Sequence, residues 1–208
     1  MSAEPLVHIV DDDASLRQAL QRLLAAAGYR VQAHASAGDF LLAAPADAPG
    51  CLLLDLRMPG PSGLDLFESL RRHGLRQPVI FLTGHGDLAT GVRAMKAGAA
   101  DFLTKPVERD TLLQAVAAAL RSDAQRRAGA AADAALHHRL GELTPREREV
   151  FELVAAGQLN KQIAYTLGIS ERTVKYERAQ VMAKLGAGTA AELGRIAAQL
   201  PPAPPPGS

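Results

Sequence analysis

Short apolar runs alternate strictly with helical patterns through residues 1–121 of the chain. Five of the runs have the length of buried strands, and the segments that follow them carry apolar residues at helical spacing. Strands that are apolar on both faces indicate a parallel sheet covered by helices on each side. Residues 1–121 are therefore predicted to form an α/β domain on a five-stranded, parallel, doubly wound sheet. The predicted strands are 6–10, 29–34, 51–54, 79–82 and 101–103, and the predicted helices are 14–27, 36–44, 62–73, 87–97 and 109–121.

A change of composition marks the end of this domain. Residues 122–139 are rich in Ala with scattered charges, and Gly129 interrupts them. Because Ala favours helix, the segment is either a helical linker or a flexible tether. Residues 140–200 contain only helical patterns and are predicted to form a compact all-α domain of four helices. The last residues, 201–208, are mostly Pro and are predicted to be disordered or extended.

Residues with helix-capping side chains stand where several predicted helices begin. Glu147 and Glu192 each follow such a residue by three positions, which predicts two capping boxes, the first with Pro145 as the opening residue of its helix. The predicted N-caps are Ser36, Thr144, Asn160, Ser170 and Thr189.

Composition narrows the classes of function that the chain can have. Cys51 is the only cysteine, so an internal disulfide and a multi-cysteine metal site are excluded. The N-terminus has no basic segment before a long apolar stretch, and no apolar run approaches the roughly 18 residues of a membrane helix. A cytoplasmic protein without membrane contact is therefore expected. The formal net charge is +1, so any contact with DNA would be made by a few well-placed cations.

Polar side chains stand at the carboxyl ends of four of the five predicted strands. They are Asp11, Asp12 and Asp13 after the first strand, Asp55 after the third, Thr83 after the fourth and Lys105 after the fifth. In a doubly wound sheet ligands bind beyond these ends, so the side chains are expected to share one rim. Clustered carboxylates at an open rim favour Mg²⁺, and a carboxylate can attack phosphorus while cations neutralise the transferred group. A single Asp after a strand is usually a turn residue or a helix cap, and Asp13 is interpreted in that way.

The second domain contains a helix, a turn with Gly and a longer helix, which is the order of a helix-turn-helix. The two predicted helices are 160–168 and 171–185. Val174, Val181 and Leu185 share one face of the longer helix, and a recognition helix needs one apolar and one polar face. Arg178 falls within the apolar arc, so it would have to reach past its neighbours to touch DNA. Periodicity alone is explained equally well by a solvated charged face.

Four segments of the first domain closely resemble the receiver domains of two-component systems, over about residues 5–121. The segments are Val10-Asp11-Asp12-Asp13, Leu54-Asp55-Leu56-Arg57-Met58-Pro59, Leu82-Thr83-Gly84-His85-Gly86-Asp87 and Asp101-Phe102-Leu103-Thr104-Lys105-Pro106. The resemblance implies the flavodoxin-like form of the doubly wound sheet, and it implies that Asp55 is the phosphoacceptor. It also implies that Asp12, Asp55 and the backbone carbonyl of Arg57 hold Mg²⁺, with Asp11 in support.

The same resemblance assigns a role to each of the other rim residues. Lys105 would pair with the phosphoryl oxygens, and the Lys105–Pro106 bond would be cis. Thr83 and Phe102 would form a switch, in which Thr83 moves to the phosphoryl group and Phe102 turns inward behind it. For Phe102, a plain core aromatic remains an equal alternative. Arg57 and His85 lie where they could modulate attack of water on the acyl phosphate.

Segments of the second domain resemble the LuxR-type helix-turn-helix, over about residues 140–198. They are Leu143-Thr144-Pro145-Arg146-Glu147-Arg148-Glu149-Val150, Asn160-Lys161-Gln162-Ile163-Ala164, Leu167-Gly168-Ile169-Ser170-Glu171-Arg172-Thr173-Val174-Lys175 and Val181-Met182-Ala183-Lys184-Leu185. Joined to a receiver, this domain is similar to the FixJ/NarL family of transcription regulators. The resemblance implies that Lys175, Tyr176 and Arg178 face base edges or nearby backbone. Phosphate contacts are implied for Lys161, Arg172, Thr173 and Lys184.

The recognition helix departs from the family pattern at two neighbouring positions. Glu177 stands where the family commonly has His, and Tyr176 is bulkier than the aliphatic residue often found there. An acid beside the groove repels phosphate, yet it can accept a hydrogen bond from a cytosine amino group. These departures affect the DNA sequence that is read rather than the binding itself.

Three functions are compared for the whole chain. The favoured one is a transcription regulator, by family resemblance an activator, whose Asp55 is phosphorylated by a sensor histidine kinase. Its partners would be promoter DNA, RNA polymerase and, on phosphorylation, a second copy of the chain. In the alternative, the receiver is an interaction module without phosphotransfer. A phosphatase with an aspartyl-phosphate intermediate is disfavoured, because such enzymes need a second acid where this chain has Arg57.

Overall fold

The computed structural model describes residues 4–43, 48–60, 62–84 and 88–199. The chain divides into two compact units, residues 1–128 and 129–208. In the described residues, no helix combines the length and the apolar character needed to cross a membrane. The predicted disordered tail, 201–208, lies outside the described residues.

The first unit is a five-stranded parallel sheet in the order β2-β1-β3-β4-β5. The prediction of a doubly wound, flavodoxin-like domain is thereby confirmed. The strands are β1 (Leu6–Val10), β2 (Arg30–His34), β3 (Gly50–Asp55), β4 (Val79–Thr83) and β5 (Asp101–Thr104). The helices are α1 (Ala14–Ala26), α2 (Ala37–Ala43), α3 (Gly63–Arg72), α4 (Leu88–Lys96) and α5 (Arg109–Gly141).

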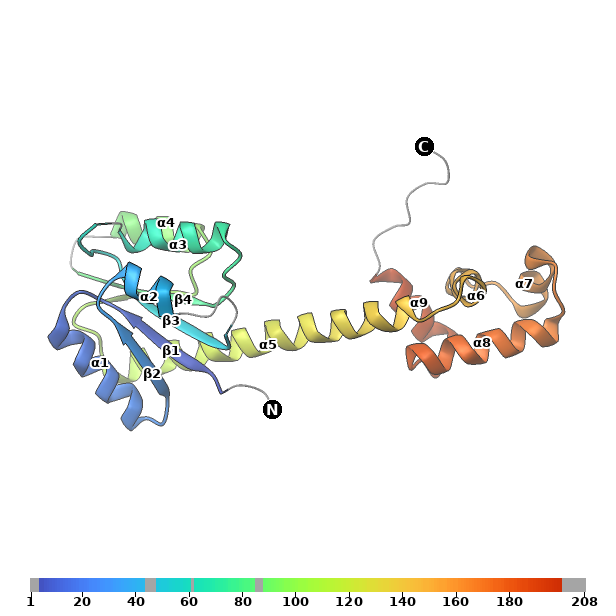
Figure 1. Cartoon of the computed structure of the whole chain (residues 1–208), viewed down its shortest axis with the longest axis horizontal. Coiled ribbons are helices and arrows are strands. Elements are labelled where there is room, and N and C mark those ends of the chain that lie inside the picture. The colour runs from blue at the N-terminus through green and yellow to red at the C-terminus, as the bar shows by residue number, and fades with distance from the viewer. Residues whose placement is uncertain (1–3, 44–47, 61, 85–87, 200–208) are drawn as a thin grey trace. The chain divides into compact units, whose positions relative to one another are not determined.

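The helices cover both faces of this sheet because its central strands are apolar on both sides. Every residue of β3 and β4 is buried. One core, which includes Phe40, Phe67 and Phe81, lies under α2, α3 and α4. The other core, which includes Leu24 and Leu112, lies under α1 and the first part of α5 (Figure 1).

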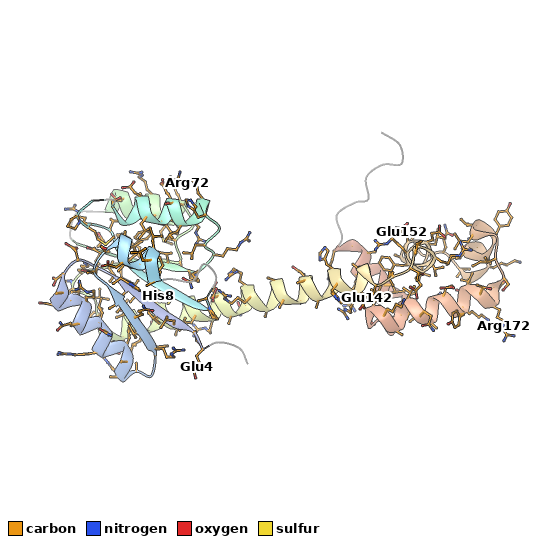
Figure 2. All side chains as sticks on the ribbon, viewed as in Figure 1. Glu4, His8, Arg72, Glu142, Glu152 and Arg172 are labelled. Atoms are coloured by element: carbon orange, nitrogen blue, oxygen red, sulfur yellow. The ribbon has the colours of Figure 1, made fainter. Side chains whose placement is uncertain are left out.

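Two histidines are buried side by side in the first of these cores. His8 of β1 and His34 of β2 place Nδ1 and Nε2 3.1 Å apart, and both rings meet the edge of Phe40. His8 is marked in Figure 2. Burial, followed by the neighbouring His34, lowers the pKa of His8 from 6.5 to about 4. The pair is therefore neutral near pH 7 and shares one proton across its hydrogen bond.

Side chains predicted as helix caps in the first unit are found in that role. Asp13 accepts hydrogen bonds from the backbone N–H groups of Ser15 and Leu16, so it caps α1 and leaves the acidic rim to its neighbours. Ser36 accepts from the N–H of Asp39 at the start of α2. These bonds satisfy N–H groups that a helix start otherwise leaves without a partner.

The sequence predicted that this helix ends at residue 121, but α5 continues to Gly141. The 122–139 segment is thus helical, and the boundary between the two compact units falls within it, after residue 128. Gly129 costs only about 1 kcal/mol relative to Ala in a helix interior, which the surrounding Ala-rich sequence outweighs. Leu136 and Leu140 supply a second reason, because both are buried in the core of the second unit.

A buried carboxylate fastens α5 to the sheet near residue 123. Asp123 accepts hydrogen bonds from the Gly50 N–H at 3.0 Å, from Arg126 at 2.6 Å and from Arg127 at 2.7 Å. Arg127 also donates to the Ala48 carbonyl at 2.7 Å. Burial raises the pKa of Asp123, but these hydrogen bonds outweigh it and the pKa is lowered. We call these contacts of Asp123 and Arg127 with residues 48 and 50 the α5 clasp.

The second unit contains the four predicted helices together with the end of α5. They are α6 (Pro145–Ala155), α7 (Asn160–Leu167), α8 (Glu171–Leu185) and α9 (Ala190–Ala198). Thr144 forms the predicted capping box with Glu147, and Ser170 caps α8 as predicted. The core of the unit includes Val150, Ile163 and Val174.

Two of the predicted caps in this unit differ in detail. Asn160 is the first residue of α7, and Leu159 occupies the cap position. Leu159 has no side-chain acceptor for the first N–H groups of α7, but its own N–H donates to the Gln162 side chain at 2.8 Å, as in one half of a capping box. Thr189 caps α9 as predicted, but the Glu192 carboxylate accepts from the Gly188 N–H rather than from that of the cap residue. The second capping box is therefore displaced by one residue.

Candidate functional site

The residues predicted to share a rim all lie at the carboxyl edge of the sheet. Asp11 and Asp12 follow β1, Asp55 ends β3, Thr83 ends β4, and Lys105 follows β5. In the parallel register Asp55 stands beside Leu82, and Thr83 beside Thr104, so these strand ends are level. Asp11, Asp55 and Thr83 are buried, and Asp12 is exposed.

Lys105 ties two of the buried carboxylates together. Its Nζ atom lies 2.8 Å from Asp11 Oδ2 and 3.0 Å from Asp55 Oδ1. The peptide bond between Lys105 and Pro106 is cis, as the receiver resemblance implied. One ammonium group thus balances part of the negative charge where the predicted phosphoacceptor lies.

The acid groups of this rim fit a divalent cation. Oxygen atoms of Asp11, Asp12 and Asp55 all lie within 4.8 Å of one another. Carboxylate oxygens at an open edge are the ligands that Mg²⁺ takes in proteins. The backbone N–H of Arg57 bonds the Asp55 carboxylate. The role of the Arg57 carbonyl as a metal ligand stays a prediction.

The charges of this rim shift one another's ionisation. Burial raises the pKa of Asp55, Lys105 lowers it, and the nearby Asp11 raises it further, so that the balance is upward. Burial by itself would lower the pKa of Lys105, but its hydrogen bonds to Asp11 and Asp55 outweigh burial and raise it. A protonated Lys105 beside crowded carboxylates is therefore the stable arrangement, and the crowding favours a further cation.

The two predicted switch residues lie near the rim, Thr83 at the end of β4 and Phe102 within β5. The Thr83 hydroxyl donates to the Gly84 carbonyl at 3.2 Å. Phe102 in β5 is half-buried and packs against the core under α4. This packing agrees in part with the alternative hypothesis, in which Phe102 is a plain core aromatic. His85, which was predicted to modulate attack of water, lies outside the described residues.

The second unit presents a helix-turn-helix formed by α7 and α8. Gly168 joins them with φ +65°, a left-handed conformation that Gly adopts without steric cost. Val174, Val181 and Leu185 are buried and hold α8 against the unit, as predicted. Arg172 extends outward at the start of α8 (Figure 2). The exposed residues among the predicted DNA contacts are Lys161, Arg172, Thr173, Lys175 and Tyr176.

Two predicted DNA contacts are engaged within the unit. Arg178 donates to the Asn160 side chain at 3.0 Å and so joins the middle of α8 to the start of α7. Lys184 lies 2.6 Å from the buried Glu147 carboxylate and also donates to the Glu142 carbonyl. Glu147 is the structural residue that the sequence pattern identified only as part of a capping box. Its partner stands 37 positions away, and no local spacing signals that pairing.

A parallel α/β unit with an acidic rim, followed by a helix-turn-helix unit, defines a response regulator with a DNA-binding output. Residues 7–117 match the family model described as "response regulator receiver domain", and residues 141–197 match "bacterial regulatory proteins, luxR family". The chain therefore belongs to the response regulators that join a receiver domain to a LuxR-type helix-turn-helix. It is a FixJ-like transcription regulator of a two-component system rather than a metabolic enzyme.

Curated relatives and solved structures agree with this assignment. The chain is 44% identical over 199 residues to nodulation protein W of Bradyrhizobium diazoefficiens, covering 96% of this chain and 88% of the relative. It is 44% identical over 191 residues to the transcriptional regulatory protein FixJ of Azorhizobium caulinodans, covering 92% and 90%. A low-resolution structure of the response regulator StyR aligns with a TM-score of 0.87 and 42% identity, covering 95% of this chain and all of that one.

Proposed function

We propose that Asp55 accepts a phosphoryl group from a sensor histidine kinase and that this modification controls promoter binding by α8. The observation that carries the proposal is the Lys105 ammonium, held 2.8 Å from Asp11 and 3.0 Å from Asp55 at a rim of clustered carboxylates. A receiver domain implies a histidine kinase as partner, and the helix-turn-helix implies DNA. Such a regulator acts in the cytoplasm, where the promoter is.

The rim residues divide the work of phosphoryl transfer. A carboxylate oxygen of Asp55 bonds to phosphorus as the bond from phosphorus to the kinase histidine breaks. Lys105 neutralises charge on the phosphoryl oxygens, and the Thr83 hydroxyl turns from Gly84 to donate to one of them. Asp12, Asp55 and the Arg57 carbonyl would hold Mg²⁺, with Asp11 in support, and the ion would supply further charge neutralisation.

The modification then shifts the receiver between two states. Phe102 turns inward behind Thr83, the surface of α4, β5 and α5 changes, and two copies of the chain associate. A dimer suits the two-fold symmetry of operators. Activation of transcription would follow through contact with RNA polymerase.

The DNA contacts fall on the exposed part of the helix-turn-helix. Lys175 and Tyr176 would face base edges, and Lys161, Arg172 and Thr173 would meet phosphates, which position the protein. Arg178 and Lys184 would support DNA binding indirectly, because their bonds to Asn160 and Glu147 hold α8 in place. Glu177 would decide which base is accepted beside Tyr176.

The test compares wild type with Asp55→Asn, each incubated with Mg²⁺ and phosphoramidate. Intact-mass measurement should find one added phosphoryl group on wild type and none on Asp55→Asn. Footprinting on the DNA upstream of the protein's own coding sequence should show protection that increases for wild type alone. Glu68→Gln, which changes an exposed carboxylate of α3, is the matched control and should behave as wild type. Equal binding by Asp55→Asn and treated wild type would favour the receiver as an interaction module.

A further inference from the structure

Helix α4 carries a glycine at the point where Phe102 lies against it. A Cβ atom built on Gly91 would stand 2.4 Å from Phe102 Cε2, 2.5 Å from Cζ and 2.9 Å from Cδ2. Real Cβ atoms essentially never come within 3.0 Å of another heavy atom, so a side chain at position 91 would require the ring to shift. The phenyl ring therefore rests directly on the backbone of α4, in space that any other residue at position 91 would fill.

The helix itself gives no reason for this glycine. Gly is among the least favourable residues in a helix interior, and Gly91 has no positive φ that would require it. One side of the ring packs against the core under α4, and another side borders open space. A hollow of about 490 Å³ is lined by Gly91, Val92, Met95, Lys96 and Phe102. This open space gives the ring room to move out of contact with Gly91.

The other switch and rim residues have contacts of their own near the ring. The Thr83 hydroxyl is bonded to the Gly84 carbonyl, and Lys105 occupies the oxygens of Asp11 and Asp55. Phe102 pairs in the sheet with Phe81 of β4, two residues before Thr83. A phosphoryl group on Asp55 would displace the Lys105 contact, so we assign the seat of the ring on Gly91 to the unphosphorylated receiver.

We propose that Gly91 is a positioning residue that sets the balance of the phosphorylation switch by providing the outward seat for Phe102. The inference rests on the proposed function, because it concerns the same switch. A side chain at position 91 evicts the ring and leaves the inward orientation behind Thr83. The unmodified state then loses population to the state that phosphorylation favours.

The experiment measures Gly91→Ala in the wild-type and the Asp55→Asn backgrounds. We expect Gly91→Ala/Asp55→Asn to bind the upstream promoter DNA about tenfold more tightly than Asp55→Asn, as for a shift of one decade in the switch equilibrium. Gly91→Ala alone should be phosphorylated by phosphoramidate faster than wild type. Gly38→Ala in α2 is the matched control, because its new Cβ would meet only Ser36 Oγ at 3.7 Å. It should leave both measurements unchanged.

A double-mutant cycle separates the seat from a general effect on α4. In a Phe102→Ala background the ring is absent, so Gly91→Ala should change neither DNA affinity nor phosphorylation rate. An equal effect with and without the ring would overturn the proposal. So would a Gly91→Ala protein that matches wild type in both measurements.

A spectroscopic measurement tests the seat independently of the proposed function. In protein labelled with 4-fluorophenylalanine, the ¹⁹F resonance of Phe102 is assigned by its loss in Phe102→Leu. Gly91→Ala should move that resonance, and Gly38→Ala should not. An unmoved resonance would overturn the seat. A moved resonance in a protein whose wild type ignores phosphoramidate would support the seat and contradict the proposed function.

Discussion

The two functional ends of this chain hold their charges in opposite ways. At the rim of the sheet, Lys105 lies within 3.0 Å of two buried carboxylates, and the group is assembled from four strand ends. On α8, Arg172 and Lys175 are exposed, as is the Tyr176 ring. The first arrangement is suited to chemistry at a fixed point, and the second to a large, hydrated partner.

The contrast also runs through α8 itself. Arg178 and Lys184 were predicted as DNA contacts on the same grounds as Lys175, yet they bond Asn160 and Glu147. Charge on a recognition helix therefore has two uses, one that holds the helix in place and one that faces the partner. The predictions that follow test whether buried and exposed charges differ as sharply in energy as they do in geometry.

The largest effect is expected from Lys105→Met. This change leaves the buried Asp11 and Asp55 carboxylates without their ammonium, which should lower the free energy of unfolding by about 3 kcal/mol. Urea unfolding followed by circular dichroism measures the loss. Added Mg²⁺ should restore part of the stability by binding the folded rim. A variant as stable as wild type without Mg²⁺ would mean that the rim charges are not coupled as described.

A smaller effect is expected from the pH dependence of the buried histidine pair. Between pH 6.5 and about pH 4, His8 is protonated in the unfolded chain but neutral in the folded protein, because folding lowers its pKa. Stability therefore falls as the pH falls, by about 2 kcal/mol from pH 7 to pH 5 for this group. Unfolding of wild type and His8→Gln at both pH values isolates the contribution. Identical pH slopes for the two proteins would show that His8 takes no part.

The Lys184→Met change should lower the free energy of unfolding more than it lowers the affinity for DNA. It leaves the Glu147 carboxylate buried without its cation, and because Lys184 is one-third exposed we expect a loss of about 1.5 kcal/mol. Hydrogen exchange should locate the loss in α6 and α8. If stability were unchanged and only DNA affinity fell, Lys184 would belong with the exposed contacts.

Lys175→Met should give the opposite result and the smallest change in stability. As an exposed side chain it should alter the free energy of unfolding by no more than about 0.5 kcal/mol. Loss of one cationic DNA contact should weaken DNA binding by about tenfold and reduce the slope of affinity against salt by about 1. A titration of promoter DNA at several salt concentrations measures both quantities. A large loss of stability would remove the distinction between Lys175 and Lys184.

The acidic rim was predictable because its residues stand at strand ends. Once the strands are recognised from their apolar runs, the parallel sheet brings Asp55 and Lys105 to one edge without further information. The partners on α8 were not predictable in this way. The bond of Lys184 to Glu147 spans 37 residues and depends on how α6 and α8 pack, which helical periodicity does not specify.

The length of α5 was the other feature that the local sequence pattern could not predict. An Ala-rich segment with a Gly is compatible with helix or coil, and the decision depends on contacts at both ends. Asp123 meets the sheet near one end, and Leu136 enters the second core near the other. Gly91 belongs to the same group, because a glycine in a helical pattern reveals its purpose only when Phe102 lies on it.

The α5 clasp bears on how this receiver can be transplanted into engineered signalling proteins. The recognised receiver segment ends at residue 117, before the clasp. A fragment cut there would lose Asp123 and Arg127, and the Gly50 N–H and the Ala48 carbonyl would lose the partners that those residues provide. Since β3 begins at Gly50 and ends at Asp55, the strand that carries the proposed phosphoacceptor would be weakened at its first residue. A chimaera that keeps residues through 128 should therefore be phosphorylated on Asp55 more readily than one joined at 117.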